Sequence, residues 1–206
     1  MSVDLNDKEA DIAGVARNAI DDEGLRAELL QGLESKNETY RYNCYKVLRI
    51  ICEEHAELVY PHWDYLAGHL DSNNTYHKLS ALDLIADLTK VDSGNRFEQI
   101  VDSYFGLLED RSMIAAVYAA RNAGKIVAAK PELEARITEK LLSIESTHHG
   151  PGRKDLVKAG AIESFITYFE QAADKEGILS FVRQQVGSES PKCRKQADAF
   201  LRIWDR

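Results

Sequence analysis

Cysteine is scarce in this chain and long apolar runs are missing. The 206 residues include three cysteines, Cys44, Cys52 and Cys193, an odd and sparse set that does not make a disulfide framework. No apolar run approaches the ~18 residues that a membrane span needs. The segment Met1–Asp7 lacks the basic and apolar regions of a signal peptide. We therefore expect a cytoplasmic protein without a membrane segment, whose thiols are small apolar side chains on buried helix faces.

An overall positive charge is also missing. The net charge is −8 and the isoelectric point is near 5.3. Binding to a phosphate backbone usually leaves a basic footprint, so nucleic acid is not the partner that this composition favours. The charge is uneven, because residues 150–206 hold 10 basic and 8 acidic side chains while the rest of the chain is acidic. The C-terminal quarter could therefore carry a small basic patch.

Signatures of catalysis are missing as well. The chain has no GxGxxG or GxxxxGK[ST] phosphate loop, no HExxH metal motif and no nucleophile elbow. The run Gly150–Lys154 superficially resembles a phosphate loop, but it follows a helical pattern and contains a proline, so we interpret it as a flexible interhelical loop. Cys52 with His55, and His148 with His149, supply only two possible ligands each. We expect no enzymatic activity, no cofactor and no metal site.

Strand patterns do not occur, and a repeat of helical patterns takes their place. There is no sustained alternation of apolar and polar residues and no Asn-Gly or Asp-Gly hairpin turn. An aliphatic residue followed by acidic or small residues recurs at intervals of 37, 38, 36 and 42 residues. These anchors are Leu33-Glu34-Ser35, Leu70-Asp71-Ser72, Leu108-Glu109-Asp110, Ile144-Glu145-Ser146 and Val186-Gly187-Ser188. Such spacing predicts stacked supersecondary units.

A short amphipathic helix is expected before each anchor and a longer one after it. After the first anchor, Cys44, Val47, Leu48 and Ile51 follow the i, i+3, i+4, i+7 pattern of a buried helix face. Residues 147–152 form an insertion that explains the longest interval. We interpret residues 4–22 as an N-terminal capping helix with an acidic polar face. One helix pair cannot bury its apolar face alone, so the pairs are expected to stack.

The second helices resemble those of HEAT and armadillo-like repeats. The segment Tyr40–Leu48 aligns without gaps to His77–Ile85, and Cys193–Leu201 follows the same pattern. Each has a basic residue, Arg41, Lys78 or Arg194, three positions before a small one. The third unit departs from the pattern, with alanine at the basic position. The resemblance implies an all-α, right-handed α-solenoid of about five helix pairs, with an N-terminal capping helix at 1–22 and the repeats at 23–206 as a single domain.

In this class of proteins the second helices usually line the concave face. The core stripes leave a series of other positions that would face this groove. They are Asn43, Lys46, Ser80, Asp83, Asp87, Tyr118, Arg121 and Lys125. A rigid surface of aromatic and charged residues suits the recognition of a protein segment. We therefore hypothesise an adaptor or scaffold that binds a protein partner there, without catalysis.

Two alternatives stay open at this point. A HEAT-like class of DNA glycosylases grips damaged DNA with aromatic, acidic and basic residues, and this chain has Trp63, Trp204 and many tyrosines. The second alternative is a part of a larger complex or a homodimer. In that case an exposed end of the stack, such as the helix from Phe200 to Trp204, would be the contact.

Overall fold

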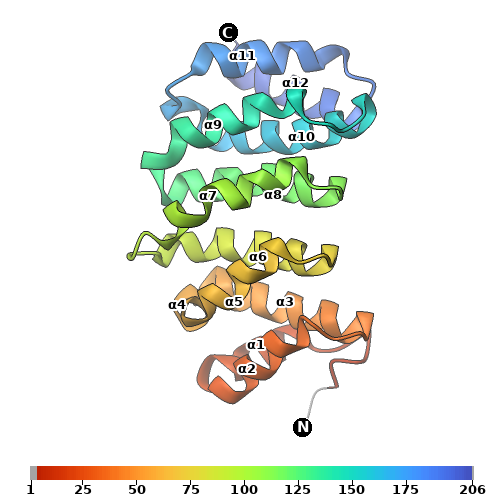
Figure 1. Cartoon of the computed structure of the whole chain (residues 1–206), viewed down its shortest axis with the longest axis vertical. Helices are drawn as coiled ribbons and strands as arrows, with labels where there is room; N and C mark the ends of the chain where they lie inside the picture. The colour runs from red at the N-terminus through yellow and green to blue at the C-terminus, as the bar shows by residue number, and fades with distance from the viewer. Residues whose placement is uncertain (1–3, 206) are drawn as a thin grey trace. The chain divides into compact units, whose positions relative to one another are not determined.

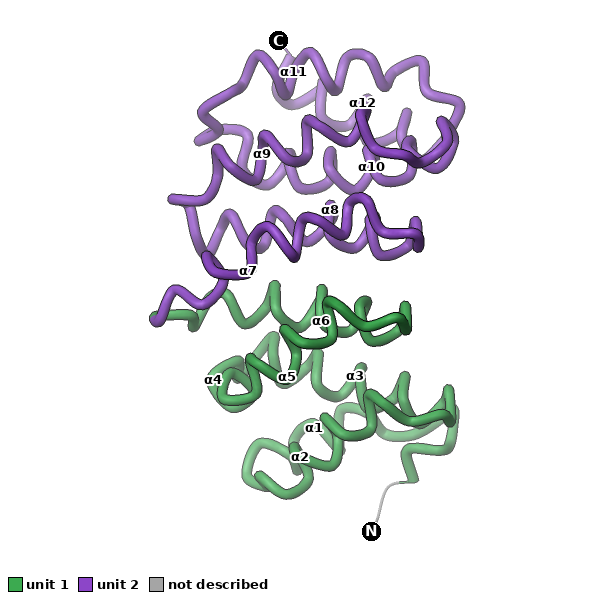
Figure 2. Tube along the Cα trace, in the orientation of Figure 1, with its two compact units in different colours: residues 1–93 green, residues 94–206 purple. Residues whose placement is uncertain are grey.

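The computed structural model describes residues 4–205, and every regular element in this range is a helix. The chain divides into two compact units, which meet in sequence at Ser93 and Gly94 (Figure 2). No helix in the described range is long and apolar enough to span a membrane.

The first unit carries the predicted cap and the first two anchors, and Figure 1 labels its helices α1 to α6. Its helices are α1 (Ile12–Asp21), α2 (Glu23–Gly32), α3 (Glu38–Glu54), α4 (Ala56–Val59), η1 (Tyr60–His62), α5 (Trp63–Gly68), η2 (His69–Asp71), α6 (Thr75–Leu88) and η3 (Thr89–Val91). Helix α1 packs on α2 and α3, and both α4 and α5 pack on α6. The end of α1 is capped from α2, because the Arg26 guanidinium donates to the carbonyls of Ala19 and Ile20 at 2.7 and 2.8 Å.

The second unit carries the other three anchors. Its helices are α7 (Arg96–Gly106), η4 (Leu107–Glu109), α8 (Met113–Ala129), η5 (Pro131–Leu133), α9 (Glu134–Leu142), η6 (Ser143–Ser146), α10 (Pro151–Tyr168), η7 (Phe169–Gln171), α11 (Lys175–Gln184), η8 (Gln185–Gly187) and α12 (Pro191–Trp204). Helix α7 contacts α8, α11 contacts α12, and α8 packs along α10. Four of the five anchors lie in 3-10 turns that end a first helix.

The same local geometry turns the chain from a first helix into a second one. We call each of these turns between a first and a second helix a joint. In three joints a serine hydroxyl oxygen accepts the backbone N–H of the residue two positions later, each at 3.1 Å. These serines are Ser35, Ser72 and Ser188. In a fourth joint the Asp110 carboxylate accepts the N–H of Ser112 at 2.8 Å. Each donor residue is itself the N-cap of the following helix, so the third anchor position needs a short polar side chain.

The basic residue of the aligned second helices has an equivalent role at both ends of the chain. Arg41 donates to the carbonyl of Ser35, and Arg194 donates to the carbonyl of Ser188. Both bonds reach back six residues, onto the third anchor position. The two helices therefore start in the same way at atomic detail, which agrees with the gapless alignment of their sequences.

Two small residues allow α8 and α10 to approach closely. A Cβ atom on Gly160 would lie 3.1 Å from the carbonyl oxygen of Val117. On the facing helix, a Cβ on Gly124 would lie 3.2 Å from the Cα of Ser164. The Ser164 hydroxyl accepts the N–H of Gly124 at 3.0 Å and donates to the Ala120 carbonyl at 2.7 Å. Glycine is needed at both positions because backbone meets backbone there.

The segment interpreted as a flexible loop, Gly150–Lys154, is mostly helical. Pro151 is the first residue of α10, and Gly150 is its N-cap. Proline is favoured at this position because its fixed φ suits a helix and its missing N–H would have no partner in the first turn. The last residues of the insertion therefore form the first turn of α10, and its other residues lie between η6 and α10.

Candidate protein-binding surface

Four of the residues predicted to face a groove are buried instead. They are Asn43, Ser80, Asp83 and Asp87. The Asn43 amide donates to the carbonyls of Leu5 and Asp7 at 2.9 and 2.7 Å, and so fastens the N-terminal segment to α3. Asp83 accepts a hydrogen bond from the Tyr45 hydroxyl. The helix flank assigned to the groove therefore includes positions that neighbouring segments cover.

The other four predicted residues, Lys46, Tyr118, Arg121 and Lys125, keep at least part of their surface accessible. On α8, Ile114 joins three of them to form a stripe at spacings of four, three and four residues, which is one face of a helix. The Arg121 guanidinium stacks 3.7 Å from the centre of the Tyr118 ring, and Ile114 is 49% exposed. We call Ile114, Tyr118, Arg121 and Lys125 the α8 stripe.

The first unit has two further cation–ring pairs, both with their cation on α3, and we call their four residues the aromatic–basic patch. It consists of Arg41, Tyr42 and Lys46 on α3 and Tyr76 on α6. Tyr42 is 58% exposed and Tyr76 is 51% exposed, the highest values among the large hydrophobic side chains of the described residues. The Arg41 guanidinium lies 4.3 Å from the centre of the Tyr76 ring, and the Lys46 ammonium lies 5.0 Å from that of Tyr42.

Local sequence explains how the patch is positioned. Tyr42 and Lys46 are four residues apart, so they stack along one side of α3, away from its buried stripe at Cys44, Val47 and Leu48. Tyr76 lies in the first turn of α6, where its N–H donates to the Asn74 cap at 3.0 Å. Of the patch residues, only Lys46 is among those predicted from the sequence to face a groove. The available signal for Tyr42 was its position outside the apolar stripe of its own helix.

The patch combines exposed aromatic area with fixed positive charge. A cation over a ring face is held in place while its other side stays accessible to a ligand. Tyrosine and arginine are the residue types that most often dominate protein–protein binding energy, together with tryptophan. The two cations make carboxylates the complementary groups for this surface, although the chain as a whole is acidic.

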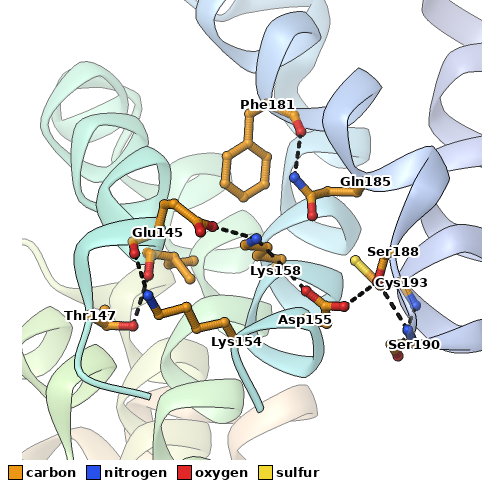
Figure 3. A network of polar contacts seen from close by, with 11 residues as sticks. Glu145, Thr147, Lys154, Asp155, Lys158, Phe181, Gln185, Ser188, Ser190 and Cys193 are labelled. Atoms are coloured by element: carbon orange, nitrogen blue, oxygen red, sulfur yellow. Dashed lines mark hydrogen bonds and ion pairs between the residues drawn. The ribbon is translucent and has the colours of Figure 1, made fainter. Parts of the chain in front are cut away.

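A polar network with little solvent exposure lies in the second unit (Figure 3). The Lys158 ammonium of α10 pairs with Glu145 of η6 and lies 3.8 Å from Asp155. Asp155 in turn accepts a hydrogen bond from the Ser188 hydroxyl, which follows η8. The Lys158 side chain is only 9% exposed and that of Asp155 only 13%. The network joins an anchor, a second helix and the next joint through charged and polar groups.

The potentially reactive groups of this network are buried or engaged in ion pairs. Cys193 lies beside Ser188 in Figure 3, but its side chain is fully buried, and burial raises the pKa of its thiol. A protonated, inaccessible thiol is neither a nucleophile nor a metal ligand. The same holds for Cys44, whose pKa burial raises to about 11. Lys158 is engaged by carboxylates rather than desolvated in an apolar pocket, as an amine nucleophile requires.

The histidines also fall short of a metal centre. No group of three or more His, Cys, Asp or Glu side chains in the described part of the chain is arranged to hold a metal ion. His148 pairs with Glu109 at 2.6 Å, and His149 bonds the carbonyl of Leu108 at 3.0 Å. The hydrogen bond from His148 lowers the pKa of the Glu109 carboxyl. These histidines tie the insertion to the anchor of the preceding repeat, Leu108-Glu109-Asp110.

The two tryptophans lie within the units. Trp63 is buried, with its ring 5.7 Å from that of Tyr60. Trp204 is half-buried and packs on Phe169 at 5.3 Å between ring centres. Phe200 is buried against the same phenylalanine at 5.0 Å. In the helix from Phe200 to Trp204, which was predicted as a terminal contact, Ile203 is the large apolar side chain that is exposed, at 49%.

Comparisons with known proteins do not identify a family for this chain. No family model, curated protein or solved structure matches the chain. The resemblance to HEAT repeats thus depends on the chain's own internal repeats, and function has to be argued from its surfaces.

Proposed function

We propose that this chain is a binding protein without catalytic activity of its own, an adaptor that takes a protein partner on the surface of its second helices. The aromatic–basic patch carries the proposal. Two tyrosines more than half exposed, each with a cation over its ring, form a surface whose composition matches the centres of protein interfaces. The α8 stripe repeats one such cation–ring pair, Arg121 over Tyr118, on a second helix of the other unit.

The proposed partner is a protein segment with acidic side chains. Its carboxylates would pair with Arg41 and Lys46, while an apolar side chain packs on the exposed ring surface of Tyr42 and Tyr76. Arg41 is already held by the Ser35 carbonyl and Lys46 by a neighbouring ring, so binding costs little side-chain entropy. We also propose the right-handed HEAT-like solenoid, in which second helices line one continuous face.

The test compares capture by the wild type with capture by a Tyr42→Ala/Tyr76→Ala variant. Tagged full-length chain is incubated with lysate of the source cells at pH 7.5, and bound proteins are quantified by mass spectrometry. We expect a bound protein to be depleted at least tenfold with the double variant, because hot-spot tyrosines contribute about 2 kcal/mol each. The affinity of that purified protein is then measured by calorimetry.

The matched control removes exposed apolar side chains elsewhere. Val186 and Ile203 are 44% and 49% exposed, so Val186→Ala/Ile203→Ala changes similar surface without touching the patch. All variants must retain the helical circular dichroism of the wild type. Equal depletion by both variants, or none by the patch variant, would contradict the proposal. Recovery of nucleic acid in place of protein would favour the DNA-binding alternative.

A further inference from the structure

The last helix has an exposed face that carries an apolar side chain beside cations. Helix α12 packs on α10 and α11, and its buried stripe includes Ala197 and Phe200. Another side of the helix carries four residues at spacings of four, three and one, which brings them onto one face. We call this face the α12 stripe, and it consists of Lys195, Ala199, Arg202 and Ile203. Ile203 is 49% exposed, and both cations of the stripe are exposed as well.

The cations of the α12 stripe form no ion pair with a described residue, in contrast to others near them. Lys192 pairs with Glu163 at 3.2 Å. Arg183 pairs with Asp205 at 2.6 Å. Helix α12 holds four basic side chains and one acidic side chain, a net charge of +3. Residues 1–93 hold 9 basic and 18 acidic side chains, a net charge of −9, so the first unit of a second copy attracts this helix.

The first unit has an apolar hollow between α1 and α3, with a volume of about 180 Å³. Its lining consists of Ala13, Ala16, Ile20, Ile50 and Ile51, together with Arg17, Glu54 and His55. An apolar cavity of ~150 Å³ holds a group as large as benzene, so the hollow has room for one isoleucine side chain. Ile20 and Ile50 keep part of their surface accessible, so a partner that covers the hollow removes apolar surface from water.

The edge of the hollow is acidic on both helices. Glu54 is exposed and is the last residue of α3. Asp21 is exposed at the end of α1, one turn after Arg17. Glu57 also lies close, 3.5 Å from Nδ1 of His55. These carboxylates outnumber the single arginine of the lining, so the edge favours a partner that brings cations together with its apolar side chain.

We propose that the α12 stripe of one copy docks on this hollow in a second copy. Ile203 enters the hollow, and the cations of the stripe meet the carboxylates at its edge. Arg202 adjoins Ile203, whereas Lys195 lies about 12 Å from Ile203 along the helix axis, so the two cations reach different parts of the edge. Apolar and charged groups thus select the same partner. Neither surface includes a residue of the aromatic–basic patch, so this contact is independent of the proposed function.

Sedimentation velocity of the full-length chain over a wide range of protein concentration tests the contact. We expect the mean mass to rise with concentration in about 0.1 M salt, and the association to weaken in about 1 M salt, which screens exposed charges. Ile203→Asp should raise the dissociation constant at least about tenfold, because it removes a buried aliphatic side chain. Val186→Asp is the matched control at a residue 44% exposed outside the stripe, and it should associate as the wild type does. A chain that stays monomeric at every concentration, or equal behaviour of the two variants, overturns the proposal.

An exchange of charges tests whether these two surfaces meet each other. Lys195→Glu/Arg202→Glu makes the stripe acidic, and Asp21→Lys/Glu54→Lys makes the edge of the hollow basic. We expect each variant alone to be monomeric, because its two surfaces then carry like charges. An equimolar mixture should associate again, since the stripe of either variant then meets the opposite charge on the other. Monomeric variants that stay apart when mixed would contradict the pairing of these surfaces.

A second control separates this pairing from a general effect of net charge. Arg111→Glu/Arg153→Glu makes the same change in net charge as the stripe variant, at exposed positions elsewhere in the second unit. It should associate as the wild type does, and loss of association in this control overturns the assignment to α12. All variants must retain the helical circular dichroism of the wild type, which is expected because every changed residue is exposed.

Discussion

Single polar side chains at the joints accept hydrogen bonds from backbone N–H groups, which apolar side chains could not do. The hydroxyls of Ser35, Ser72 and Ser188 each accept a backbone N–H that has no partner within its helix, and Asp110 does the same with a carboxylate. Two of these hydroxyls have a second role, since Ser72 bonds His77 and Ser188 bonds Asp155. The joint residue therefore also sets the hydrogen bonding of the neighbouring polar clusters.

At the scale of the residue, we predict the cost of removing the Lys158 charge. Lys158→Met leaves Asp155 buried without its cation, while Glu145 can turn to solvent because its side chain is 67% exposed. We expect a loss of about 2 kcal/mol in the free energy of unfolding, below the full cost of breaking a buried pair. Guanidinium unfolding followed by circular dichroism measures it.

Two further variants test the cause of that loss. Adding Asp155→Asn to Lys158→Met keeps an acceptor for Ser188 and removes the uncompensated charge, so most of the stability should return. Lys192→Met breaks the exposed pair with Glu163, whose side chains are 49% and 32% exposed, and should cost less than about 1 kcal/mol. Equal losses for Lys158→Met and Lys192→Met would show that the buried network contributes no more to the free energy of unfolding than an exposed ion pair does.

At the scale of the element, the second helices differ in how closely they approach. Helices α8 and α10 meet through small residues, with the Ser164 hydroxyl bonded to the backbone of α8. Helix α3 carries larger side chains, and its Asn43 bonds the backbone of the N-terminal segment. The aligned repeats thus use different polar residues to satisfy buried backbone groups.

Gly160→Ala should destabilise the chain although alanine favours helices. The added Cβ would lie 3.1 Å from the Val117 carbonyl and 3.3 Å from the Arg121 nitrogen, both of them backbone atoms. Separating two helices costs about 1–3 kcal/mol, more than the gain of about 1 kcal/mol in helix propensity. Chemical denaturation provides the measurement.

Gly152 supplies the control on the same helix. A Cβ there meets nothing within 4 Å, so Gly152→Ala should be neutral or stabilise by up to about 1 kcal/mol. If both alanine variants gain stability, the close approach of α8 and α10 in solution is looser than described.

At the scale of the whole molecule, the described chain divides into two compact units, each with its own buried residues. Trp63, Leu48 and Leu82 are buried in the first, and Phe97, Phe165 and Phe200 in the second. The aromatic–basic patch lies in the first unit, whereas the α8 stripe and the Lys158 network lie in the second.

We predict that residues 94–206 fold when expressed alone. They keep α7 to α12 together, so the buried surface of the second unit is formed mostly within the fragment. The expected result is a helical circular dichroism spectrum and a cooperative thermal transition. A fragment of residues 130–206 lacks α8, the main neighbour of α10, and should not fold. Failure of the longer fragment to unfold cooperatively would show that its core needs the first unit.

The sequence by itself determined the all-helical class, the positions of the joints and the capping residues. Apolar spacing and capping act over three or four residues along the chain, so they can be read without knowing any neighbour. The expectation that Lys46, Tyr118 and Arg121 keep accessible surface also came from this periodicity. The adaptor function and the solenoid remain predictions.

Only the tertiary structure decided which polar residues on the second helices are covered. Asn43 and Tyr42 are adjacent, yet one is 2% and the other 58% exposed. Successive residues point about 100° apart around a helix, so burial at the edge of a stripe depends on where the next segment packs. For Asn43 that segment is the backbone at Leu5 and Asp7, more than 30 residues away in sequence. The stacking of Arg41 on Tyr76 likewise joins two helices whose contact no local pattern encodes.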